Sequence, residues 1–115
     1  MHAFDVLGDP VRRRIIELLG EGELTSGGIV ELIGAEFGIT QSAVSQHLAV
    51  LRSSGFAVVR RDGARRIYAL EPGPLSEIDR WMDRFRHLWG QKLDALHTEI
   101  VRGRRARRDA DEESS

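Results

Sequence analysis

The sequence predicts a mainly α-helical fold with one small β-hairpin and a long C-terminal helix. Three observations support this prediction. A helix with one apolar face and one small, uncharged face is expected over residues 41–54, and a basic hairpin follows over 56–70. From Leu75 to about Arg102 only Gly90 interrupts a second helical pattern, and a helix of that length, roughly 42 Å, is too long for one small domain to cover.

The helix predicted over residues 41–54 has two unlike faces. Val44, Leu48 and Leu51 recur at helical spacing and form a stripe that must be buried. The opposite face carries short, uncharged side chains, namely Ser42, Ser45, Gln46 and Ala49. Small residues allow close approach to the DNA major groove, and amide and hydroxyl groups match base edges. The alternative is an ordinary amphipathic helix of a helical core. Thr40 is the expected N-cap, and Gly55 the expected stop.

A hairpin is predicted after Gly55. Two runs rich in β-branched and aromatic residues flank Asp62-Gly63-Ala64, and an Asp-Gly pair is a strong turn signal. The residues near the tip include four arginines, Arg60, Arg61, Arg65 and Arg66. Such a cluster is either a solvated face or, beside a small polar helix, a wing that binds phosphate. Helix, turn, helix and basic hairpin together define a winged helix-turn-helix.

Composition indicates one globular domain in 115 residues, with 41% hydrophobic and 30% charged residues. Net charge is only −1, but residues 40–70 hold five arginines against one acid, so positive charge gathers on the predicted DNA face. Cysteine is absent, which excludes disulfides and thiolate metal sites. Neither an apolar run of membrane-spanning length nor a secretory segment is evident, so a cytoplasmic protein without membrane contact is expected.

The N-terminal part predicts two further helices after a short apolar lead-in. Asp9 and Pro10 suit the start of the first, whose neighbouring Arg12, Arg13 and Arg14 point in different directions and are expected to be solvated or paired within the chain. Thr25 or Ser26 caps the second, which runs to about Phe37. Its inward residues are expected to be Ile29, Leu32, Ile33 and Phe37.

Large apolar residues recur every three or four positions along the last helix. So many exposed apolar groups favour packing against a second copy in a two-fold dimer over packing along their own domain. After residue 103 the chain becomes a basic and then acidic run, expected to be disordered at its end. We therefore predict a DNA-binding and dimerisation domain over 1–103 and a charged tail over 104–115.

Three segments in register resemble the ArsR/SmtB family of bacterial repressors: residues 9–19, residues 41–48 and residues 61–68. The resemblance extends over roughly residues 4–100. It implies a dimer of winged helices on operator DNA, with the N-terminal lead-in joining the interface. The segment 34–37 makes the helix before residue 40 longer than is common in the family, by about three residues. That extra length either lengthens the helix or bulges the turn.

Metal sensing does not follow from the resemblance. The positions that match the family's cysteine pair are Thr25 and Gly27, neither of which binds a soft metal. Asp83, His87, Asp94 and His97 on the last helix are possible zinc ligands only if two chains converge, and solvated helix surface is the simpler interpretation. No histidine lies in a catalytic motif, so an enzyme is not expected and no cofactor or metal is predicted.

The sequence thus predicts a homodimeric, sequence-specific repressor that binds double-stranded DNA at a palindromic operator, with an unidentified small molecule or protein as a possible effector. The alternative is a winged-helix module that binds a partner protein. The predicted DNA-binding residues are Gln41, Ser42, Ser45, Gln46, His47 and Arg52 on the helix and Arg60, Arg61, Arg65 and Arg66 on the wing. The predicted dimer interface comprises Phe4, Leu7, Ile78, Trp81, Phe85, Leu88, Trp89, Leu93 and Leu96.

Overall fold

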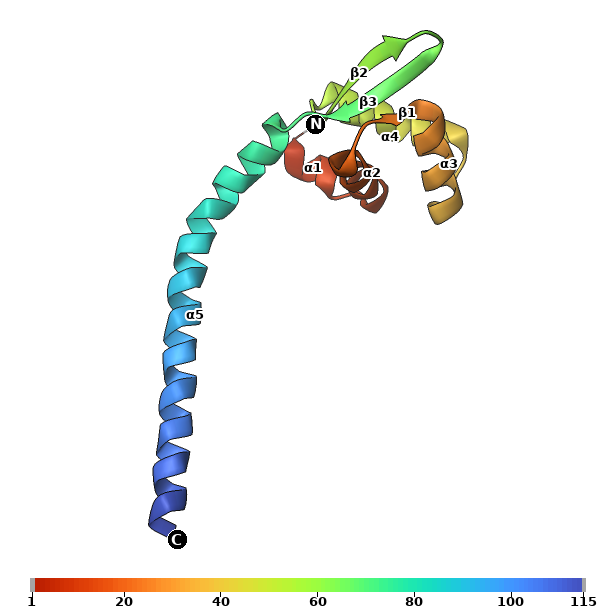
Figure 1. The fold of residues 1–115 in the computed structure, drawn as a ribbon. Coiled ribbons are helices and arrows are strands. Elements are labelled where there is room, and N and C mark those ends of the chain that lie inside the picture. Colours follow the sequence, from red (N-terminus) through yellow and green to blue (C-terminus); the bar gives the residue numbers. More distant parts are fainter. Residues whose placement is uncertain (1, 115) are drawn as a thin grey trace. The chain divides into compact units, whose positions relative to one another are not determined.

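A computed structural model describes residues 2–114 of the chain, so the predictions that include Met1 and Ser115 extend beyond the described residues. The mainly helical fold with a small hairpin and a long last helix is confirmed (Figure 1). The elements follow in the order α1 (Ala3–Leu7), α2 (Pro10–Glu21), β1 (Leu24–Thr25), α3 (Ser26–Phe37), α4 (Gln41–Ser53), β2 (Ala57–Asp62), β3 (Arg65–Leu70) and α5 (Gly73–Ser114). The chain divides into two compact units after Ile78.

The core of the first unit lies where α2, α3 and α4 meet the base of the hairpin. Its largest fully buried side chains are Phe56, Ile15, Ile29, Ile33, Leu51, Val6 and Val44. Two predicted core residues of α3 are wrong, because Leu32 is 49% exposed and Phe37 is 36% exposed. The buried side of α3 is a narrow line through Ile29 and Ile33. Leu32 lies about 100° around the helix from Ile33, and Phe37 falls in the last turn, beyond the core.

Side-chain caps define where three helices begin. The Asp9 carboxylate accepts hydrogen bonds from the backbone amides of Val11 and Arg12 at the start of α2. Thr25 and Thr40 do the same for α3 and α4, each at 3.1 Å. The extra residues 34–37 lengthen α3, which ends at Gly38, whose φ of 65° is a left-handed conformation that suits glycine. The turn before α4 is therefore short.

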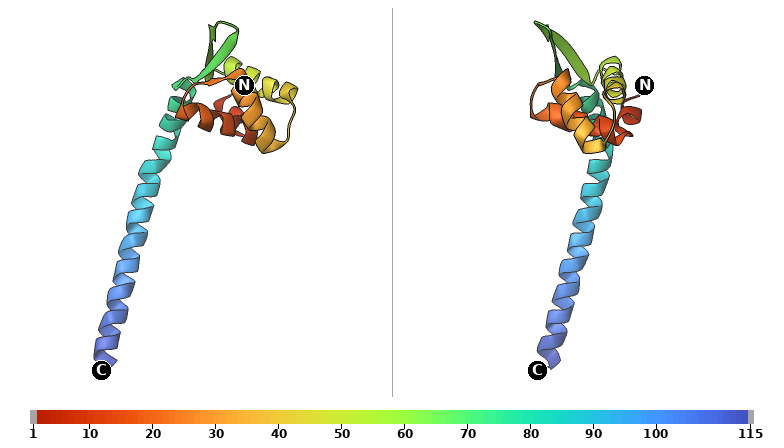
Figure 2. Two further views of the ribbon diagram at one scale, coloured as in Figure 1. Left: turned by 45° about the vertical axis from the view of Figure 1, so that its right-hand side comes forward. Right: turned by 90° about the vertical axis from the view of Figure 1, so that its right-hand side faces the viewer.

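The hairpin belongs to a three-stranded antiparallel sheet in the order β1-β3-β2. The short strand β1 pairs Leu24 with Tyr68 and was not predicted, because two residues carry no periodicity. Strands β2 and β3 pair from Ala57 with Leu70 to Asp62 with Arg65. Gly63, with φ 64°, opens a two-residue turn in which Ala64 keeps a negative φ, as in a type II′ turn. The tip of the hairpin projects beyond the helices of this unit (Figure 2).

Helix α5 continues to Ser114, whereas the sequence predicted an end near Arg102 and a disordered tail. Residues 104–114 contain no glycine or proline, and their arginines, alanines and glutamates favour a helix. Helical propensity therefore extends through the charged run.

Candidate nucleic-acid interface

Helix α4 presents one continuous exposed face. Val44, Leu48 and Leu51 are buried as predicted, at 0%, 3% and 0% exposure. The residues around the opposite side are all exposed, namely Gln41, Ser42, Ser45, Gln46, Ala49 and Arg52. This face has one charged group, Arg52, and no bulky side chain. The structure therefore brings together five of the six residues predicted on this helix for DNA binding.

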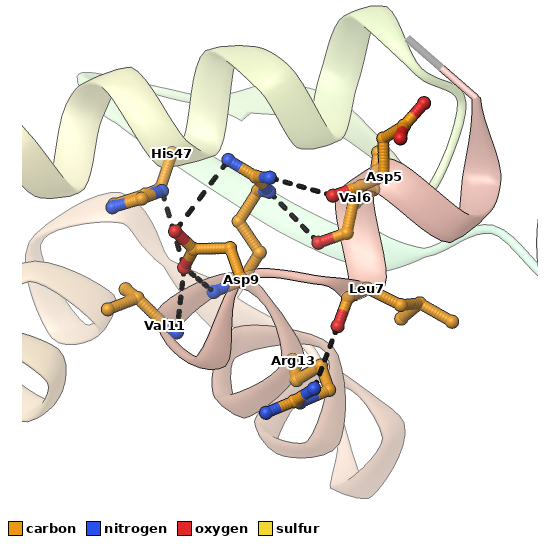
Figure 3. A network of polar contacts seen from close by, with 8 residues as sticks. Asp5, Val6, Leu7, Asp9, Val11, Arg13 and His47 are labelled. Carbon is orange, nitrogen blue, oxygen red and sulfur yellow. Dashed lines mark hydrogen bonds and ion pairs between the residues drawn. The ribbon is translucent and has the colours of Figure 1, made fainter.

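The sixth, His47, turns toward the body of the unit. Its Nδ1 lies 3.9 Å from an oxygen of Asp9, and its side chain is only 21% exposed (Figure 3). In this contact His47 bridges α4 to the N-cap residue of α2.

The three arginines of α2 have different partners, as their different directions around the helix predict. Arg12 donates to the carbonyl oxygens of Val6 and Asp5, at 3.0 and 2.9 Å, and Arg13 donates to that of Leu7 at 3.0 Å (Figure 3). These bonds bring side-chain donors to the last carbonyls of α1 and join that helix to α2. Arg14 pairs with Glu17 and Glu36. The predicted pairing within the chain is confirmed.

Asp9 is the centre of this network, and its pKa lies below the usual 3.8. Burial by itself raises the pKa of this carboxyl, but the backbone amide of Arg12, the charge of His47 and the amide of Val11 together outweigh that effect. The carboxylate therefore stays ionised where it caps α2 and faces α4.

The four wing arginines do not form one patch. In the register of the hairpin Arg61 lies opposite Arg66, and these two share a face with Tyr68, two residues further along β3. Arg60 and Arg65 lie on the other face, where Arg65 is directly opposite Asp62. This division could have been predicted from the sequence, because side chains alternate between the two faces along each strand and the register then assigns each arginine to a face.

Arg60 is also tied to the body of the unit. Its guanidinium lies 2.6 Å from a carboxylate oxygen of Glu23, just before β1. In the register of the sheet, Arg60, Ile67 and Thr25 form a row, so the Arg60 side chain crosses β3 to reach Glu23. Sequence reasoning missed this acidic partner, because Glu23 stands 37 residues away.

A hollow of about 580 Å³ separates α4 from the inner face of the hairpin. Arg52 and Ser45 of α4 line one side, and Arg66 and Tyr68 of β3 line the other. The remaining lining residues are small, apolar or uncharged: Ser26, Gly27, Val30, Gln41, Leu48, Ala49 and Ala64. The wall therefore carries positive charge and no carboxylate.

The second unit is the greater part of α5, and its most prominent feature is an apolar stripe. The ring centroids of Trp81 and Phe85 are 4.7 Å apart, and the ammonium of Lys92 lies 5.4 Å from the ring centroid of Trp89. The stripe is 41–59% exposed and comprises Trp81, Phe85, Leu88, Trp89, Leu93, Leu96 and Ile100. Among the other predicted interface residues, Phe4 is 40% exposed, whereas Leu7 and Ile78 pack against the core of their own unit.

The histidines of α5 and its carboxylates as far as Glu99 are exposed. Asp83 pairs with Arg86 at 3.7 Å, and within residues 2–114 no group of three or more His, Cys, Asp or Glu is placed to hold a metal ion. No helix in this part of the chain is long and apolar enough to cross a membrane.

A helix-turn-helix whose exposed face carries one arginine and no acid, followed by an arginine-bearing hairpin, defines a winged-helix DNA-binding protein. Residues 9–58 match the family described as "Bacterial regulatory protein, arsR family". The chain belongs to this family. Its members bind DNA as transcriptional regulators, so the chain is a DNA-binding transcriptional regulator and not an enzyme.

Individual relatives agree with this assignment. The HTH-type transcriptional regulator Rv2034 of Mycobacterium tuberculosis is 36% identical over 83 residues, which cover 72% of this chain and 74% of that protein. The transcriptional repressor SdpR of Bacillus subtilis is 32% identical over 84 residues, covering 73% and 89% respectively. A crystal structure described as a possible transcriptional regulator for arsenical resistance superposes with a TM-score of 0.63, at 36% identity over 75% of this chain and 85% of that one.

Proposed function

We propose that the chain is a homodimeric repressor that binds a palindromic operator, with one α4 in the major groove of each half-site. The observation that carries this proposal is the exposed face of α4, where the side chains of Gln41, Ser45 and Gln46 are open to solvent. Amides and hydroxyls on such a surface match the donors and acceptors of base edges. The proposed base-reading set is Gln41, Ser42, Ser45 and Gln46, with Arg52 and the wing on phosphate.

The dimer is proposed from the apolar stripe of α5. Seven large side chains on one helix face, each 41–59% exposed, are more apolar surface than a monomer ordinarily leaves in water. A second copy of α5, packed on this stripe around a two-fold axis, covers it. That axis imposes the same symmetry on the two α4 helices, so the half-sites are expected about one helical turn apart.

The release of such a repressor from DNA would require an effector other than a soft metal. The chain has no cysteine, and the described residues group no metal ligands. A small molecule or a partner protein is the proposed class of effector.

Selection of binding sequences from a random DNA pool tests the proposal. The full chain should enrich an inverted repeat whose half-sites are centred about 10 base pairs apart. Measured at fixed salt, affinity for that sequence should exceed affinity for scrambled DNA by at least about 10³-fold. Enrichment of nothing, with binding that depends only on charge, would contradict specific recognition and favour the alternative of a protein-interaction module.

A further inference from the structure

The hollow between α4 and the hairpin has the chemistry of an anion site. Arg52 and Arg66 line it from opposite sides, and no acidic residue lines it. Within residues 2–114 neither guanidinium forms a hydrogen bond or ion pair. Two cations facing one hollow without a counter-charge repel each other, and an anion between them removes that repulsion.

The register of the hairpin supports the same conclusion. Arg61 lies directly opposite Arg66, a like-charge pair that disfavours the pairing, on the same face as Tyr68, which also lines the hollow. On the outer face Arg60 pairs with Glu23 at 2.6 Å, and Arg65 lies directly opposite Asp62. Of the two arginine pairs on the wing, only the inner one has no acid on its own face of the hairpin.

We propose that this hollow seats a backbone phosphate of the operator, bound by Arg52 from α4 and by Arg66 from the wing, with Arg61 beside it. The proposal rests on the proposed function and narrows it, because it removes Arg60 and Arg65 from the DNA-binding set. Arginine is suited to the task, since its planar fork binds two phosphate oxygens at once.

The surroundings of the hollow identify the anion as part of a DNA strand rather than a small free ion. Gln41, Ser45 and Ala49 line the hollow and also belong to the exposed face of α4. A phosphate held there is therefore next to the groove that α4 enters. The small lining residues Gly27 and Ala64 leave room for the sugars on either side of that phosphate.

Operator duplexes in which one phosphate at a time is replaced by an uncharged methylphosphonate test the proposal. The wild-type chain should lose about tenfold in affinity at one or two phosphates in each half-site. Arg66→Gln and Arg52→Gln should each weaken binding to the unmodified operator by a similar factor. At those same phosphates the two variants should lose little or nothing more, because the contact is already gone.

Arg60→Gln and Arg65→Gln are matched controls on the outer face of the same wing. Both should bind the operator within about twofold of wild type and keep its full sensitivity to methylphosphonate. Thermal melting should show that all four variants are folded. Free inorganic phosphate at equal ionic strength should compete no better than chloride, because the site is shaped for a strand.

Two results would overturn the proposal while leaving operator recognition intact. In one, Arg52→Gln and Arg66→Gln keep the wild-type methylphosphonate pattern. In the other, Arg65→Gln reproduces their effect. Failure of the wild-type chain to bind any selected operator would instead overturn the proposed function, and this inference with it.

Discussion

The Nδ1 atom of His47 lies 3.9 Å from the Oδ1 atom of Asp9, so a side chain of α4 reaches the residue that caps α2 (Figure 3). The Arg12 side chain lies 4.0 Å from the other oxygen of the same carboxylate and also binds the end of α1. The Asp9 carboxylate and the Arg12 side chain therefore link the three helices α1, α2 and α4.

Replacing Asp9 by alanine should lower the free energy of unfolding by about 1 kcal/mol, the usual value of an N-cap. The amides of Val11 and Arg12, now bonded at 2.8 and 3.1 Å, would lose their acceptor. Urea denaturation measures the change. Glu31→Gln, at an exposed position of α3, is the control and should change stability by less than about 0.5 kcal/mol. Equal effects of the two substitutions would contradict the capping role.

Asp9→Asn keeps a capping side chain but removes its charge, and its effect should depend on pH. The pKa of Asp9 is lower in the folded chain than the usual 3.8, so the ionised carboxylate contributes stability above that pH. This contribution is lost as the pH falls through the folded pKa. The difference in stability between wild type and Asp9→Asn should therefore be present above pH 3.8 and shrink as the pH falls below that value. A difference that grows in acid would reverse the assigned sign.

Ser45→Ala combined with Gln46→Ala should reduce operator preference more than binding to random DNA. Contacts to base edges specify, at about 1–3 kcal/mol for a good pair, whereas phosphate contacts mainly position the protein. Arg61→Gln combined with Arg66→Gln should instead weaken both kinds of binding and flatten the salt dependence. Fluorescence anisotropy at several salt concentrations separates the two effects. Identical behaviour of the two double variants would contradict the division between helix and wing.

Trp89→Ala should shift the chain from dimer toward monomer. The indole is 57% exposed in the single chain, so its contribution comes from burial against a second copy. Analytical ultracentrifugation measures the shift. His87→Ala is the matched control, because His87 lies on the opposite side of α5 and is exposed. A wild-type chain that stays monomeric at tens of micromolar would exclude the proposed interface.

Operator binding should not respond to arsenite or peroxide. The chain contains no cysteine, so neither reagent finds a thiolate. Binding titrations with and without each reagent test this, and a several-fold loss of affinity would contradict it. A loss caused by zinc and abolished by His87→Ala or His97→Ala would instead indicate a site formed between two chains.

The sequence by itself determined the local structure of the DNA-binding unit. Thr40 begins α4 because its hydroxyl accepts from a backbone amide three residues ahead, and Gly63 makes the hairpin turn because its φ is positive. Helical periodicity likewise identified Val44, Leu48 and Leu51 as buried. These features depend on neighbours within a few positions along the chain, which a sequence displays directly.

Only the tertiary structure decided which of the exposed groups remain available to DNA. His47 turns to Asp9 and Arg60 to Glu23, across 38 and 37 positions of sequence, and periodicity carries no information about such distant partners. Leu32 and Phe37 were assigned to the core because they are apolar. The face of α3 that packs on the core is too narrow to include them, so both are exposed. Arg52 and Arg66 face one hollow because the sheet register and the packing of α4 bring them there. Burial and charge compensation are properties of groups that meet in space, and for this reason the fold alone determines them.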